Sequence, residues 1–152
     1  AFFLIKYWRY NFNLMEKISP DLNYKKIFLF FGIGSAIFLI LHSIFLGVKF
    51  DNDFYKLFRR VLVLFFIIFE VIAQTILVIN FYKIKEQIKK LINSRILIIK
   101  IILVSILVVV ALVSIPFLVD KGYNSFKHAL EWNYFMGVIS FYLLTFFFWK
   151  KQ

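Results

Sequence analysis

Four long apolar runs, separated only by short charged stretches, constrain this chain more than any other feature of its sequence. They cover Ile27–Val48, Val61–Tyr82, Ile96–Val119 and Trp132–Trp149. Each is close in length to the ~20 residues that a helix needs to cross a hydrocarbon core. Backbone groups in lipid have no water to bond, so only helices or closed barrels satisfy them, and these runs lack the alternation of barrel strands. The sequence therefore predicts an all-α, polytopic membrane protein with four transmembrane helices.

The rest of the chain leaves no room for a separate soluble domain, because 62% of its 152 residues are hydrophobic. We therefore expect a single four-helix transmembrane domain over residues 1–152. The segment before the first run is too short to span, and its Tyr7, Trp8 and Tyr10 are residue types that prefer the headgroup level. We expect residues 1–26 to be an interfacial segment, either a helix in the membrane plane or a loosely docked tail.

The net charge of +11 would indicate nucleic-acid binding in a soluble protein, but here most basic residues lie in the gaps between the runs. We therefore expect no nucleic-acid partner. The N-terminal segment, the loop between the second and third runs and the C-terminus, together with Lys100 at the adjacent end of the third run, hold 13 of the 19 Lys and Arg residues, against 6 on the other side. Basic loops stay on the cytoplasmic side. This predicts cytoplasmic N- and C-termini in a bacterial inner membrane, or the equivalent side of an organellar inner membrane.

Several kinds of chemistry are not expected from this sequence. It contains no cysteine, which excludes thiolate catalysis and thiolate metal sites, and it has no nucleotide-binding, hydrolase or zinc motif. Its two histidines, His42 and His128, are expected at depths that differ by about 10 Å, which disfavours haem ligation by the pair. His128, Glu131 and Asp120 have metal-binding side chains, but their spacing matches no metal motif. We expect no enzyme activity, no cofactor and no metal.

Ionisable residues inside a membrane are costly and are the default functional candidates. Glu70 lies near the midpoint of the second run with Gln74 one turn away, and His42 lies within the first run. Glu131 and Asn133 lie at the outer end of the fourth. We call these five residues the polar seam. They either form part of a proton or cation path, because a His–Glu pair passes protons near neutral pH, or they fix the packing of helices.

Small residues form a stripe along the first run: Gly32, Ser35, Ala36, Ser43 and Gly47. We call this stripe the packing face. Residues four apart share one side of a helix, and small side chains let a second backbone approach closely. The stripe predicts a helix–helix contact, within the bundle or with another subunit. Gly and Ser are also common in membrane helices that make no such contact.

The segment Lys83–Asn93 is basic and has isoleucine and leucine at helical spacing. It either contacts anionic lipid or a partner, or it is a solvated extension of the second span. Lys100, at the inner end of the third run, is expected to extend its ammonium group toward the interface.

Two functions are consistent with these features. The first is a small, non-enzymatic integral membrane subunit that packs within a larger membrane protein complex, with lipid-facing and partner-facing apolar surfaces. The high phenylalanine content, 22 residues, supplies such surfaces. The alternative is a small transporter, channel or proton-conducting component that uses His42 and Glu70. The expected partners are membrane lipids and other membrane protein subunits.

Overall fold

The structure is a computed structural model that describes residues 1–20, 25–47, 53–119 and 124–150, with side chains for all of these except 53, 56, 114–119 and 124–128. The described residues form helices, which confirms the all-α prediction. The helices are α1 (Phe2–Ile18), α2 (Lys25–Leu46), α3 (Asp53–Lys83), α4 (Lys85–Ile88), α5 (Ser94–Val119) and α6 (Asn124–Phe148).

Three stretches of helix are long and apolar enough to cross a membrane: Lys25–Leu46, Leu57–Lys83 and Ser94–Val113. Large apolar side chains are also exposed, among them Phe30 at 67% and Phe146 at 79%. In water such exposure would be unfavourable, so these features indicate a membrane protein. The fourth predicted run lies in α6 except for its last residue, Trp149, and its crossing of the membrane remains a prediction.

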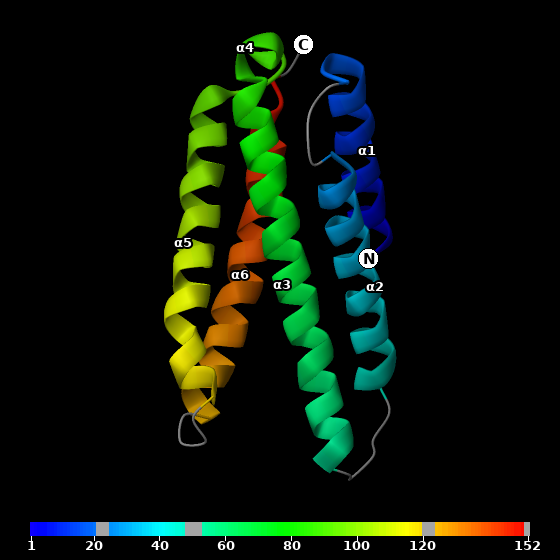
Figure 1. Ribbon diagram of the computed structural model, residues 1–152, viewed down its shortest axis with the longest axis vertical. Coiled ribbons are helices and arrows are strands. Elements are labelled where there is room, and N and C mark those ends of the chain that lie inside the picture. Colours follow the sequence, from blue (N-terminus) through cyan, green and yellow to red (C-terminus); the bar gives the residue numbers. More distant parts are fainter. Residues whose placement is uncertain (21–24, 48–52, 120–123, 151–152) are drawn as a thin grey trace. The chain divides into compact units, whose positions relative to one another are not determined.

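The chain divides into two compact units, Ala1–Ile76 and Leu77–Gln152. The first contains α1, α2 and most of α3; the second contains the end of α3 with α4, α5 and α6 (Figure 1). Helix α3 runs through the boundary between them. The single four-helix domain expected from the sequence remains a prediction.

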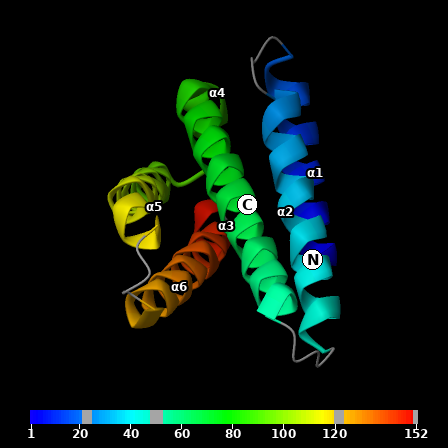
Figure 2. The ribbon, with the colours of Figure 1, turned by 60° about the horizontal axis from the view of Figure 1, so that its bottom comes forward.

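Helix α1 lies alongside α2 in the first unit (Figures 1 and 2). Its buried residues are Trp8, Asn11 and Met15, which share one face of the helix. The Trp8 ring lies 6.0 Å from the ring of Phe28, and a Cβ at Gly32 would collide with the Trp8 indole. Helix α1 thus packs on α2 through this face, and the interfacial location of residues 1–26 remains a prediction.

Helix α3 begins two turns before the predicted start of the second run at Val61. The extra turns are held against α2, because the Phe45 ring packs on Tyr55 at 6.1 Å and on Phe58 at 5.2 Å. The Tyr55 hydroxyl also donates a hydrogen bond to the carbonyl oxygen of Phe45. Aromatic packing and one hydrogen bond therefore extend the helix into a segment expected to precede it.

In the second unit α5 packs against α6. The Tyr134 hydroxyl donates to the Leu107 carbonyl oxygen at 3.1 Å, and a Cβ at Gly137 would lie 2.6 Å from Leu107 Cδ2. Gly137 therefore lets the two helices approach closely. At the other end of α6, the Phe148 ring lies 5.2 Å from the ring of Phe81 at the end of α3.

Candidate functional site

The strongest polar cluster joins α2 to α3 inside the first unit and consists of Ser35, Glu70 and Gln74, which are all fully buried. We call it the carboxyl cluster. Ser35 Oγ donates to Glu70 Oε2 at 2.6 Å, and Gln74 Nε2 donates to Glu70 Oε1 at 3.0 Å. Both carboxyl oxygens of Glu70 thus have a donor. In a low-dielectric environment such satisfied polar bonds hold helices together in one register.

Aromatic rings from α2 and α3 pack on one another at the residues that precede Ser35 and Glu70. Phe69 is the residue before Glu70. Its ring centroid lies 4.9 Å from that of Phe31 and 5.1 Å from that of Phe38. A Cβ at Gly34, the residue before Ser35, would lie only 2.6 Å from Phe69 Cδ1. The absent side chain at Gly34 is therefore what lets the Phe69 ring lie against α2.

The polar seam is only partly assembled by these contacts. His42 lies seven residues beyond Ser35 on α2, about 10 Å along the helix axis. It is half-buried. Glu70 accepts hydrogen bonds from Ser35 and Gln74. A direct His42–Glu70 pair remains a prediction.

The other two members of the polar seam belong to the second unit. Asn133 is exposed, and its Nδ2 donates to the Ala129 carbonyl oxygen at 2.8 Å within α6. Glu131 is half-buried. A continuous path from these residues to Glu70 remains a prediction.

The packing face of α2 divides into two halves. Gly32, Ser35 and Ala36 are buried, with Gly32 against Trp8 of α1 and Ser35 against Glu70 of α3. Ser43 and Gly47 are exposed, and the Ser43 hydroxyl donates to the Leu39 carbonyl oxygen of its own helix at 2.8 Å. The half that begins α2 thus contacts helices of the same chain, and the other half, Ser43 and Gly47, is exposed in the described part of the chain.

Sequence reasoning missed a second buried polar site, at Lys100. This lysine is 2% exposed, and its Nζ donates to Thr145 Oγ1 at 2.7 Å. The same Nζ lies 4.2 Å from the ring centroid of Phe141 and 4.9 Å from that of Phe148. One hydroxyl oxygen and two ring faces thus surround the amine, in place of a carboxylate. Phe141, Thr145 and Phe148 recur at i, i+4 and i+7, so the sequence places them on one face of α6, which is the face that contacts Lys100.

Within the described part of the chain, no three or more His, Cys, Asp or Glu side chains come together as a possible metal site. Of the weak metal set considered above, His128 and Asp120 lie outside the described side chains. No protein-family model matches this sequence, and no curated protein or solved structure is significantly similar to it. The site and the fold are therefore the only basis for a function.

Proposed function

We propose that this chain is a non-enzymatic integral membrane subunit that packs within a larger membrane protein complex. The main support is the carboxyl cluster, whose polar groups bond to one another across α2 and α3. A buried carboxyl whose two oxygens both accept hydrogen bonds serves to fix helix packing. Large apolar side chains on the outside of α2, α5 and α6 then remain for lipid and for neighbouring subunits.

The proposed subunit crosses the membrane four times with cytoplasmic N- and C-termini. The excess of basic residues on that side, 13 against 6, favours this orientation. Helix α6 has 25 residues, which at the helical rise is about 37 Å and exceeds a hydrocarbon core of about 30 Å.

The alternative is a small transporter, channel or proton-conducting component. It is favoured by a carboxyl near the middle of a candidate span, since such groups mark ion and proton pathways. Glu70 is fully buried, however, and its carboxyl oxygens accept hydrogen bonds from Ser35 and Gln74. Transfer through Glu70 would therefore require α2 and α3 to separate.

A comparison of particle mass separates the two functions. The chain in its native membranes, solubilised in mild detergent, should migrate on a native gel as a larger particle than the chain expressed alone. Cross-linking should identify the same membrane subunits at a fixed ratio. If the chain expressed alone forms the native particle, and proteoliposomes show a proton or cation flux that Glu70→Gln abolishes, the alternative replaces the proposal.

A further inference from the structure

Basic side chains gather where the second unit turns from α3 into α5. We call this group the basic corner: Lys83, Lys85, Lys89, Lys90, Arg95 and Lys150. Five of the six are exposed, and Lys85 is half-buried with its Nζ 4.8 Å from the centre of the Tyr82 ring. Glu86 is the one acidic residue between Lys83 and Arg95.

Buried apolar side chains anchor the backbone of the basic corner. Ile84, Ile88 and Ile92 are 4%, 1% and 0% exposed. These isoleucines are four residues apart and the lysines lie between them. Because the isoleucines face the interior, the lysine side chains face outward. The segment is therefore an anchored turn and not the solvated extension of a helix.

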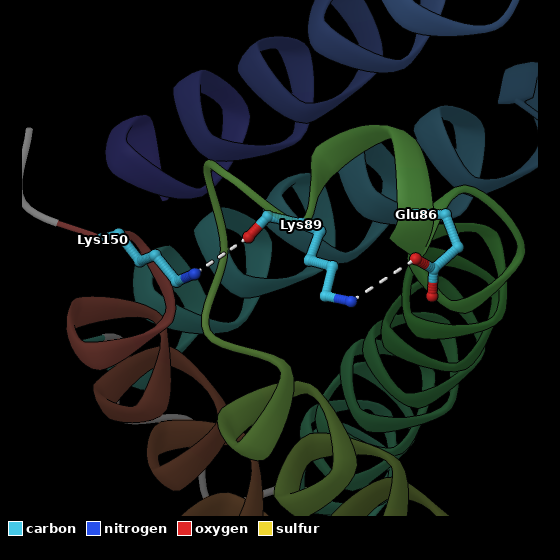
Figure 3. Close-up of polar contacts among 3 residues, drawn as sticks. All are labelled: Glu86, Lys89 and Lys150. Atoms are coloured by element: carbon cyan, nitrogen blue, oxygen red, sulfur yellow. Dashed lines mark hydrogen bonds and ion pairs between the residues drawn. The ribbon is translucent and has the colours of Figure 1, made fainter.

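The C-terminal residues complete the basic corner. The Lys150 backbone N–H donates to the Leu91 carbonyl oxygen at 2.9 Å, and Ile92 and Trp149 form an antiparallel bridge. Lys150 Nζ then donates to the Lys89 carbonyl oxygen at 2.9 Å (Figure 3). This pairing places the charge of Lys150 beside a lysine that lies 61 residues earlier in the chain.

The charges of the basic corner are poorly compensated. Lys89 Nζ lies 3.7 Å from Glu86 Oε2, an exposed pair that contributes little (Figure 3). Among the described residues, none of the other five basic side chains forms an ion pair. The backbone thus holds several positive charges close together, and an anionic ligand would offset their mutual repulsion.

We propose that the basic corner binds the phosphate headgroups of anionic phospholipids. The candidate span in α3 ends at Lys83 and that in α5 begins at Ser94. The corner therefore connects two candidate spans directly and lies at the depth of the headgroups, with Tyr82 as an interfacial aromatic. The proposal depends on the membrane location of the chain and is independent of its role as a subunit.

Native mass spectrometry of the purified full-length protein tests the proposal with phosphatidylglycerol and phosphatidylcholine as probes. Phosphatidylglycerol should bind more tightly. Each basic residue contributes roughly fivefold near an anionic surface, so the double variant K89Q/K90Q should weaken binding about 25-fold. The control K6Q/R9Q removes the same charge from α1 and should leave binding unchanged. Equal affinity for the two lipids, or equal loss in the two double variants, would overturn the proposal.

The role of the C-terminal pairing is tested separately. K150Q removes one charge and should weaken phosphatidylglycerol binding roughly fivefold. K150P also removes the N–H that bonds to Leu91 and should weaken binding further. Equal effects would show that the pairing does not organise the basic corner. Tight binding of a soluble polyglutamate peptide without preference for phosphatidylglycerol would identify an acidic protein partner and reject the lipid.

Discussion

Ser35 and Glu70 are joined by a 2.6 Å hydrogen bond between side chains that have no exposed surface. The bond connects α2 to α3 across 35 residues of sequence. Apolar helix faces in lipid slide past one another at little cost, because lipid tails are as apolar as the side chains. A polar bond between two helices has one good register, so this pair determines how α2 and α3 meet.

The first prediction concerns Glu70 itself. Glu70→Gln keeps side-chain shape and hydrogen-bonding capacity, and should unfold at nearly the wild-type temperature. Glu70→Leu leaves the buried amide of Gln74 without its acceptor and should lower the free energy of unfolding by about 1–3 kcal/mol. Thermal unfolding in detergent measures both. The matched control is Ile68→Leu on the exposed side of the same helix. An unchanged Glu70→Leu protein would mean that the carboxyl cluster does not hold the helices.

The second prediction separates the two halves of the packing face. Gly32→Leu forces a side chain into the Trp8 indole and should destabilise the chain by about 1–3 kcal/mol. A Cβ at Gly47 would lie 3.8 Å from the Ile44 carbonyl oxygen, an ordinary contact, so Gly47→Leu should leave the stability of the isolated chain unchanged. Ile37→Leu, at an exposed position of α2, is the control for both.

The same Gly47→Leu variant also reports on assembly. If it lowers the mass of the native complex while the isolated chain stays stable, the half of the packing face with Ser43 and Gly47 contacts another subunit. A Gly32→Leu protein as stable as wild type would instead contradict the packing of α1 on α2.

The third prediction is a double-mutant cycle at Lys100. Thr145→Val removes the hydroxyl that accepts from the ammonium group and should cost about 1–3 kcal/mol. The same change in a Lys100→Met background should cost much less, because no buried amine then needs an acceptor. Urea or SDS titration of the four proteins gives the coupling energy. Additive effects would show that the Lys100–Thr145 bond contributes nothing to stability.

The fourth prediction concerns topology. Reporter domains fused after Gln152 should read as cytoplasmic, and a reporter inserted at Asn124 should read the opposite face. Signals from the same side at both positions would show that α6 does not cross the membrane.

The sequence predicted α2 and α5 well, because an apolar run of membrane length permits little besides a helix. It did not anticipate the buried face of α1 against α2, because Tyr7, Trp8 and Tyr10 are residue types expected at the headgroup level. Trp8, Asn11 and Met15 recur at i, i+3 and i+7, and that spacing already indicated a buried face.

The candidate site was predicted residue by residue but not as a set of partners. Glu70 and Gln74 share a helix, so their contact follows from local spacing. Ser35 was recognised only as a small residue, because its bond to Glu70 depends on the register between α2 and α3. Lys100 was expected to reach the interface, because its acceptors on α6 lie more than 40 residues away in sequence.

The C-terminal pairing also sets an order of events during synthesis. Lys89 and its neighbours leave the ribosome 61 residues before Lys150, a delay of roughly 3–12 seconds at bacterial to eukaryotic translation rates. During this time the turn lacks the Lys150–Leu91 hydrogen bond and the Ile92–Trp149 bridge. The turn acquires the charge of Lys150 only after α6 has been synthesised. A chain that stalls within α6 therefore lacks one charge of the basic corner and the backbone pairing that holds it.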